Sequence, residues 1–352
     1  MLTKIDIQEF LEQRKSGHAI LDVRSPSEFI QGHIPDAVNL PLFDDRERAS
    51  VGYAYKQVGP QRAMELGLEI AGDKLKDLVL QAEKLANGKP VLVHCWRGGK
   101  RSGSIGWLLD FTGMHVSLLL GGYKAYRGHL QKWLEEKLLP FIVLGGKTGS
   151  GKTVILRTLA ERGEQVLDLE RLASHKGSAF GWIGEEQQPS TEQFENEIFE
   201  TLSGFDLSRP IWVENESRTI GKVFVPESLW TRMRISPLIH VEVPLDERVT
   251  KLVSDYTGSQ SQMALQESFL KIRKKLGGQN VNAALEALQR NDYHTAAEIA
   301  LTYYDKTYAY GLETTQAITI DQIDGSNFNA YRIADQLMLL AQDKLHHHDT
   351  VS

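Results

Sequence analysis

A glycine-rich loop between an apolar run and a helical run is the feature that most constrains how this sequence can fold. Residues 141–144 are apolar, residues 145–153 form the loop, and residues 154–160 have helical spacing. Within the loop, Gly146 is followed after four residues by Gly151, Lys152 and Thr153, which is the Walker A spacing. A strand, such a loop and a helix in this order predict an α/β unit with a parallel sheet.

The same loop predicts a site for phosphate groups. Glycines allow backbone N–H groups to close around phosphate oxygens. Lys152 is expected to reach terminal phosphates, and the Thr153 hydroxyl is a candidate Mg²⁺ contact. The candidate phosphate- or diphosphate-binding residues are Gly146, Gly149, Gly151, Lys152 and Thr153. A nucleotide, another diphosphate and a nucleic-acid backbone all fit this pattern.

Three further residues are candidates for contacts with Mg²⁺ or phosphate near the loop. Asp168 and Glu214 each end a short apolar run, where a carboxylate can face a bound Mg²⁺. Arg218 follows Glu214 closely and could face the phosphate. The two carboxylates compete for one role, and the sequence alone does not rank them.

The pattern of apolar residues predicts the organisation of the whole chain. Short apolar runs alternate with helical spacing, which indicates α/β domains over residues 1–138 and 139–245. Residues 246–352 have a mainly helical pattern. Residues 44–72 fit the alternation poorly and are expected to form a partly helical insertion. The expected strands are 20–23, 90–94, 116–120, 141–144, 165–168, 211–214 and 238–243.

Cys95 is the only cysteine in the sequence. An intramolecular disulfide and a cysteine-rich zinc module are therefore excluded. A lone thiol fits a reducing compartment, and the first residues lack the apolar core of a signal peptide. No apolar run approaches the roughly 18 residues of a membrane helix. These features predict a cytoplasmic protein without a membrane segment.

The residues around Cys95 predict a second anion-binding loop. Cys95 directly follows an expected strand, and a helix is expected soon after it. A glycine-rich turn of this kind aims backbone N–H groups at one point and stabilises a thiolate or a bound anion. Arg97, Lys100 and Arg101 add positive charge. The candidate catalytic residues are Cys95, Arg97 and Arg101.

Two chemistries use such a cysteine loop. Five residues separate Cys95 from Arg101, which is the Cys-x5-Arg spacing of phosphatases, where the arginine clamps the phosphate. In sulfurtransferases the cysteine instead carries sulfur or selenium as a persulfide-like intermediate. The loop by itself leaves both open.

Charge is distributed unevenly along the chain. The formal net charge is −6, which is not typical of a nucleic-acid-binding protein by itself. Residues 89–132, however, contain seven basic residues and one acidic residue, and Lys271, Arg273, Lys274 and Lys275 form a second basic cluster. Basic surface on an acidic chain suits an anionic ligand held at defined places.

Residues 21–41 resemble the signature of the rhodanese domain, in which Asp22 and Arg24 help to fix the sheet end near the active loop. A rhodanese domain followed directly by a Walker A unit is an unusual pairing. The pairing, together with residues 45–52, 55–57, 94–102, 145–153, 168–178 and 214–218, resembles the bacterial tRNA 2-selenouridine synthase family. Arg101 lies one position further from Cys95 than in many single-domain rhodaneses, a departure that is compatible with a larger chalcogen or a phosphate-bearing donor.

The resemblance implies a fold and a reaction. The fold is α/β, with a rhodanese-like parallel-sheet domain, a P-loop NTPase-like domain and a helical C-terminal region. The family exchanges the sulfur of wobble 2-thiouridine in tRNA for selenium from selenophosphate, through an intermediate S-geranylated from geranyl diphosphate. Cys95 would carry the selenium, steadied by Arg97 and Arg101, and the P-loop would hold a diphosphate, with Mg²⁺ as a candidate ion.

The implied partners are tRNA and an enzyme that produces selenophosphate. Basic side chains would contact tRNA phosphates, and Trp96 would stack on the reacting base. The tRNA-binding candidates are Trp96, Lys100, Lys124, Arg127, Lys271, Arg273, Lys274 and Lys275.

Three alternatives stay open. The first is a phosphatase or arsenate reductase that uses Cys95 and Arg101, which would leave the P-loop unexplained. The second is a P-loop kinase with a rhodanese domain kept only for binding. The third is an RNA-binding adaptor in sulfur transfer, which would bind tRNA without changing a nucleoside.

Overall fold

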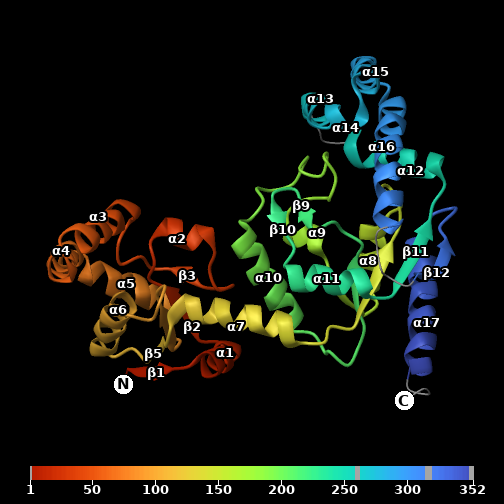
Figure 1. Cartoon of the computed structure of the whole chain (residues 1–352). Helices are drawn as coiled ribbons and strands as arrows, with labels where there is room; N and C mark the ends of the chain where they lie inside the picture. Colours follow the sequence, from red (N-terminus) through yellow and green to blue (C-terminus); the bar gives the residue numbers. More distant parts are fainter. Residues whose placement is uncertain (1, 258–261, 314–318, 349–352) are drawn as a thin grey trace. The chain divides into compact units, whose positions relative to one another are not determined.

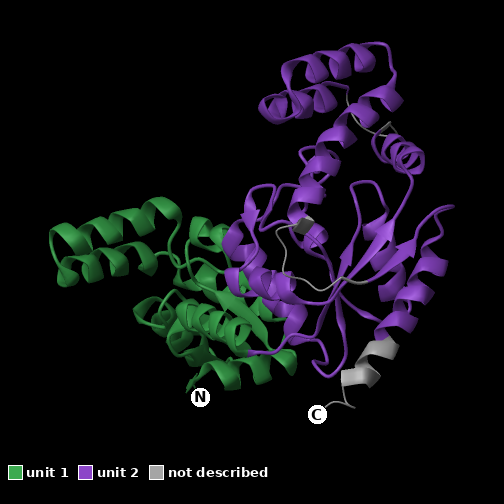
Figure 2. Ribbon diagram, turned by 45° about the vertical axis from the view of Figure 1, so that its right-hand side comes forward, with its two compact units in different colours: residues 1–136 green, residues 137–352 purple. Residues whose placement is uncertain are grey.

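A computed structural model describes residues 2–257, 262–313 and 319–348. The chain divides into two compact units, residues 1–136 and 137–352, coloured green and purple in Figure 2. Within the described residues, each unit contains a five-stranded parallel sheet with helices, so the expected α/β class is confirmed. The finer division of the second unit at residue 245 stays a prediction. None of the described helices is long and apolar enough to cross a membrane.

The first unit builds its sheet in the order β1-β5-β4-β2-β3, and every neighbouring pair is parallel. Its elements are β1 (Thr3–Ile5), α1 (Ile7–Lys15), β2 (Ala19–Asp22), α2 (Pro26–Gln31), β3 (Val38–Asn39), α3 (Asp45–Gln57), α4 (Pro60–Gly72), α5 (Leu75–Ala86), β4 (Val91–His94), α6 (Lys100–Phe111), β5 (Val116–Leu119) and α7 (Gly122–Glu136). Strands β4 and β5 are buried along their length. Strands covered on both faces require continuous apolar runs, which is why the sequence identifies these two so clearly.

The segment that fits the alternation poorly forms two helices, α3 and α4, which lie side by side in Figure 1. Helix α3 begins with a capping box, in which the Asp44 and Glu47 side chains each bind the other residue's backbone N–H. Such a reciprocal cap fixes the start of a helix. The insertion is therefore a helical hairpin added to the sheet.

The second unit has the sheet order β12-β11-β6-β8-β7, again parallel throughout. Its first elements are β6 (Phe141–Gly145), α8 (Lys152–Glu161), β7 (Gln165–Leu167), α9 (Leu169–Leu172), α10 (Thr191–Ser203), β8 (Ile211–Glu214), the antiparallel pair β9 (Thr219–Ile220) and β10 (Val223–Phe224), α11 (Glu227–Ile235) and β11 (Leu238–Glu242). Those that follow are α12 (Leu245–Thr257), α13 (Gln262–Lys271), α14 (Arg273–Leu276), α15 (Gly278–Gln289), α16 (Tyr293–Glu313), β12 (Thr319–Asp324) and α17 (Ala330–His348).

Two clusters of buried residues hold the second unit together. One lies between the sheet, α8 and α17, where Ile333 and Leu337 are fully buried. Strand β12 belongs to this core, although it comes from the segment whose pattern is mainly helical. The other cluster joins α13, α15 and α16 to the loop around Phe180.

The topology brings the candidate residues of each unit to one edge of its sheet. Strand β4 leads into Cys95, β6 leads into the glycine-rich loop, and β8 ends at Glu214. In parallel α/β sheets, ligands bind at the carboxyl ends of the strands.

The turn between β5 and α7 packs directly on the cysteine loop. The backbone N–H groups of Tyr123 and Lys124 donate to the carbonyls of Cys95 and Trp96, both at 2.9 Å. Gly122 has a φ of +60°, and a Cβ there would lie 2.2 Å from the Cys95 carbonyl oxygen. Only glycine permits this approach.

We therefore expect Gly122→Ala to destabilise the first unit by about 3 kcal/mol or more, because backbone atoms must move apart. Chemical denaturation of the full chain measures the effect. Gly128→Ala is the matched control on the same helix, because a Cβ there meets nothing within 4 Å. The control should be neutral or stabilising by about 0.5–1 kcal/mol. Equal stability of the two variants would contradict the packing argument.

Candidate functional site

The first candidate site surrounds the Cys95 thiol at the end of β4. The residue is 3 % exposed, and its Sγ lies 3.2 Å from the Ser102 hydroxyl at the start of α6. Burial by itself raises the pKa of Cys95. Hydrogen bonds from the Ser102 hydroxyl and from the backbone N–H groups of Ser102, Arg97 and Gly99 outweigh it, so the net pKa is lowered. The loop therefore favours a thiolate, or another anion at the same point.

A buried ion pair supports the loop from within the sheet. Arg24 and Asp22 are both fully buried, and Arg24 Nη2 lies 2.6 Å from the Asp22 carboxylate. Arg24 also donates to the Gly32 carbonyl and lies over the Tyr123 ring, with its Cζ 4.0 Å from the ring centroid. A charge enclosed in this way is a structural element, because it has no access to a ligand.

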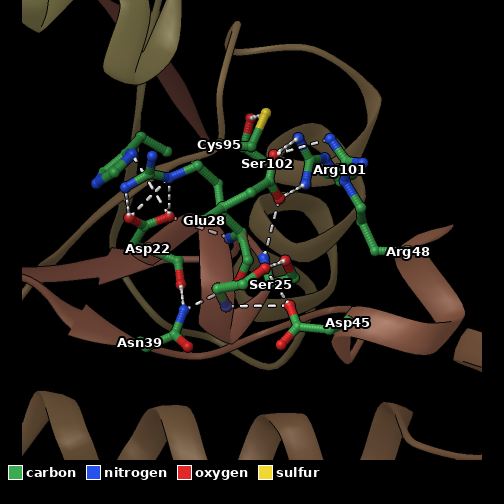
Figure 3. Close-up of polar contacts among 12 residues, drawn as sticks. Asp22, Ser25, Glu28, Asn39, Asp45, Arg48, Cys95, Arg101 and Ser102 are labelled. Carbon is green, nitrogen blue, oxygen red and sulfur yellow. Dashed lines mark hydrogen bonds and ion pairs between the residues drawn. The ribbon is translucent and has the colours of Figure 1, made fainter. Parts of the chain in front are cut away.

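Arg101 pairs with Glu28 (Figure 3). The Arg101 guanidinium donates two hydrogen bonds to the Glu28 carboxylate, at 2.6 and 3.3 Å. Arg48, from the inserted helix α3, approaches the same carboxylate at 3.5 Å. Burial raises the pKa of Glu28, but Arg101, the Ser25 N–H and Arg48 together lower it overall, so this carboxylate is ionised at neutral pH. One carboxylate thus holds two guanidiniums at the edge of the cysteine loop.

The second candidate site is the glycine-rich loop after β6. Gly146, Gly149 and Gly151 have positive φ angles of 152°, 83° and 78°. Lys152 opens α8, and its ammonium donates to the Gly146 carbonyl at 2.8 Å. The Gly146 N–H donates to the Tyr308 hydroxyl at 2.7 Å, and this hydroxyl lies 3.0 Å from His240 Nδ1. The loop has the strand–loop–helix geometry that phosphate binding requires.

Three carboxylates gather beside Lys152. One oxygen from each of Glu170, Glu214 and Glu216 lies within 4.8 Å of the others, which is close enough to hold a metal ion. Glu214 lies 3.4 Å from the Lys152 ammonium, and Glu170 accepts a hydrogen bond from the Thr153 hydroxyl at 2.9 Å.

Burial and mutual repulsion govern the protonation of this cluster. They raise the pKa of Glu170 to about 9 and that of Glu216 to about 8, and burial raises the pKa of Glu214 as well. Burial lowers the pKa of Lys152, but Glu214 and Glu216 raise it to a larger extent. Lys152 is therefore a cation, and the neighbouring carboxyls share protons at neutral pH.

Two comparisons with known proteins agree on one family. Residues 139–332 match the tRNA 2-selenouridine synthase AAA domain, and residues 6–129 match the rhodanese-like domain. A tRNA 2-selenouridine synthase of Bdellovibrio bacteriovorus is 35 % identical over 90 % of this chain and 94 % of its own. The chain belongs to the tRNA 2-selenouridine synthase family.

Further relatives carry the same name. The synthase of Marinobacter nauticus is 34 % identical over 90 % of this chain and 94 % of its own. That of Nitrosomonas europaea is 41 % identical over 67 % of this chain, and this match covers 63 % of that relative. The predicted family is thereby confirmed, with both of its domains.

In this family member, the structure places most candidate residues on or near the two loops. Arg97, Lys100 and Lys124 are exposed, Arg127 is half-buried, and Trp96 is half-buried with its ring centroid 5.7 Å from that of Tyr123. Lys271, Arg273, Lys274 and Lys275 are exposed on α13 and α14, and Lys271 pairs with Glu267 at 3.0 Å. Their roles toward tRNA stay predictions.

Two candidate contacts of the phosphate site have other partners. Asp168 caps α9 by accepting from the Arg171 N–H at 2.9 Å. Arg218 pairs with Glu227 at 2.6 Å, and about half of its side chain is exposed. Glu214, the other candidate carboxylate, lies beside Lys152. Its contact with Mg²⁺ stays a prediction.

Sequence reasoning missed Glu170 and Glu28. Glu170 lies two residues beyond Asp168, and the short turn of α9 carries it to Thr153. Glu28 comes from the rhodanese signature, but its pairing with Arg101 joins residues 73 positions apart. Tyr308, 162 residues from Gly146, was not identifiable by spacing either.

We expect Ser102→Ala to raise the pKa of the Cys95 thiol, because burial then acts against fewer hydrogen bonds. The pH profile of alkylation by iodoacetamide measures this directly, since Cys95 is the sole cysteine. Ser104→Ala, at an exposed position on the same helix, is the control and should keep the wild-type profile. A Ser102→Ala profile that matches the wild type would show that the hydroxyl has no influence on the thiolate.

The carboxylate cluster predicts a stability that falls with rising pH in the absence of divalent ions. Glu170 and Glu216 keep protons in the folded state up to about pH 9 and 8, whereas they ionise near their ordinary pKa of 4.5 when unfolded. The folded state thus binds more protons in this window, and the unfolding free energy declines as pH rises. Glu216→Gln should reduce the decline, measured by denaturation in a chelating buffer. Glu227→Gln at the surface should leave it intact, and an unchanged slope in Glu216→Gln would refute the assignment.

Proposed function

We propose that this chain replaces the sulfur of wobble 2-thiouridine in tRNA with selenium from selenophosphate, through an S-geranylated intermediate made from geranyl diphosphate. The observation that carries the proposal is the presence of two anion loops in one family member. One presents a cysteine of lowered pKa, and the other a lysine-bearing phosphate loop. Neither loop alone accounts for both a selenium donor and a diphosphate donor.

The first half-reaction belongs to the P-loop. The thiocarbonyl sulfur of the base attacks C1 of the geranyl group, the C1–O bond breaks, and diphosphate leaves. The leaving group gains charge as it departs, so Lys152 and the loop N–H groups stabilise it. Thr153 with Glu170, Glu214 and Glu216 fits Mg²⁺, which prefers oxygen ligands and would neutralise charge on the diphosphate.

The second half-reaction belongs to the cysteine loop. A selenium nucleophile attacks C2 of the geranylated base, the C2–S bond breaks, and the sulfur leaves as geranylthiol. S-alkylation is what makes this sulfur a competent leaving group. The selenium of selenophosphate is this nucleophile, and water then cleaves the P–Se bond and releases phosphate. Cys95 is the proposed catalytic residue of this step, and the N–H groups of Arg97, Gly99 and Ser102 that lower its pKa also suit the anionic donor. Arg97 is exposed beside the loop, and Arg101 supplies the second cation once it leaves Glu28.

Binding of tRNA is proposed for the exposed basic residues of both units. Lys100, Lys124 and Arg97 lie around the cysteine loop, and Lys271 with the α14 cations lies in the second unit. Phosphate contacts of this kind give affinity without reading sequence. Trp96 beside Cys95 is the proposed stacking partner of the extruded base.

Nucleoside mass spectrometry tests the proposal. The full chain is given 2-thiouridine tRNA, geranyl diphosphate, Mg²⁺ and selenophosphate, and the digested tRNA should contain geranylated thiouridine followed by selenouridine. Cys95→Ser should lower selenation by more than about a hundredfold while geranylation persists, and Lys152→Ala should lower geranylation.

The outcomes separate the alternatives. If active substrates give neither product with the wild type, the proposed reaction is wrong. Release of phosphate from a phosphotyrosine substrate at Cys95 would instead favour the phosphatase, and nucleotide turnover unaffected by Cys95→Ser would favour the kinase. Selenation retained by Cys95→Ser would remove Cys95 as a catalytic residue.

A further inference from the structure

The second unit contains an apolar cavity that the phosphate loop alone does not explain. It lies between α12, α13, α15 and α16 and opens to the surface. Small-molecule sites are mostly apolar hollows with few polar groups, and many lie between helices, so the lining of this cavity suits a ligand. Its apolar lining includes Leu252, Leu265, Phe269, Leu288, Ala297 and Ala300.

Three hydroxyls at this cavity, those of Ser178, Tyr293 and Tyr304, have hydrogen-bond partners within the protein. The Tyr304 hydroxyl accepts from the Ala179 N–H at 2.9 Å. Burial raises the pKa of Tyr304 to about 12, although hydrogen bonds from Ala179 and Ser178 act against it, so the phenol is neutral. A cavity lined mainly by apolar side chains favours a hydrocarbon surface, because a polar ligand would lose its hydrogen bonds to water there.

The cavity adjoins the phosphate loop. Thr148, inside the loop, is one of its lining residues. A Cβ on Gly149 would lie 3.2 Å from Cγ of Leu252, which lines the cavity from α12. Arg248, one turn earlier on α12, donates to the Thr148 carbonyl at 3.2 Å and pairs with Asp305 on α16 through two contacts of 2.8 Å. Arg248 thus fastens the loop to two helices of the cavity wall.

We propose that this cavity binds the hydrocarbon chain of a phosphorylated ligand whose diphosphate lies on the P-loop, and that the ligand is a prenyl diphosphate of about ten carbons. The inference rests on the proposed function for the choice of geranyl diphosphate. The juxtaposition of an apolar cavity with a phosphate loop argues for such an amphiphile independently. A purine nucleotide fits less well, because a base offers hydrogen-bonding edges that these walls do not meet.

The test compares ligands that share the diphosphate and differ in the tail. Calorimetry of the full chain with Mg²⁺ should find geranyl diphosphate bound more than about tenfold tighter than inorganic diphosphate, because only the former buries apolar surface. Ala297→Phe projects a ring into the cavity from the half-buried face of α16 and should remove most of this advantage. The affinity for inorganic diphosphate should stay within about twofold of the wild type, which also reports that the loop is folded.

Two further variants keep the result interpretable. If the larger ring of Ala297→Phe disturbs folding, Ala297→Leu replaces it as the test. Leucine fills less of the cavity, so this variant should give an intermediate loss of geranyl diphosphate affinity. Ala283→Phe, exposed on α15 and outside the lining, is the matched control and should bind both ligands as the wild type does.

Failure of the cavity and failure of the proposed function give different results. If geranyl diphosphate keeps its advantage in Ala297→Phe, the tail binds elsewhere and the cavity assignment is wrong, while the proposed function stands. If neither diphosphate binds the wild type, the P-loop assignment fails and the cavity proposal fails with it. If ADP binds more tightly than geranyl diphosphate and loses that advantage in Ala297→Phe, the occupant is a nucleoside and the proposal is overturned.

Discussion

The candidate site of the second unit depends on the contacts of the Lys152 ammonium. This ammonium binds the carbonyl of Gly146 within its own loop, and it stands beside Glu214 at the end of the neighbouring strand. Without this cation, Glu170, Glu214 and Glu216 would be three acidic groups forced together in a poorly hydrated place. The carboxyl groups keep their protons, because neutral buried carboxyls cost less free energy than unpaired buried charges. Diphosphate and Mg²⁺ would arrive with opposite charges and so replace that proton-based balance with an ionic one.

The two candidate sites resemble each other in backbone geometry and differ in how they hold positive charge. Each lies at the carboxyl end of a parallel strand, where a loop enters a helix and backbone N–H groups are suited to hold an anion. In the P-loop the cation is buried and fixed. In the cysteine loop Arg101 and Arg48 share Glu28 near the surface, and this carboxylate restrains positive charge that would otherwise lie free beside the thiolate. A phosphate-bearing donor bound at Cys95, as proposed above, would compete with Glu28 for Arg101.

How much could be predicted from the sequence follows from the range of each interaction. The strands β2, β4, β6 and β8 and both anion loops were predictable, because apolar runs and glycine spacing are local patterns. Glu28 and Tyr308 were not, because each acts on a residue far along the chain. Strand β12 carries isoleucine at only two of six positions, Ile320 and Ile323, and is an edge strand, so its pattern hardly differs from that of a loop. The cavity beside Thr148 escaped for a similar reason, since apolar faces of four helices create it only on packing.

The contact between Gly122 and the cysteine loop bears on protein engineering. The carbonyls of Cys95 and Trp96 are held by N–H groups of α7, and the Gly98 nitrogen lies against Gly122. The conformation of the cysteine loop therefore depends on residues 121–124, which pack against it. A transplant of residues 94–102 into another scaffold would leave two carbonyls without donors and the loop without its backing. A transfer of the cysteine loop to another protein must therefore include both segments in their native arrangement.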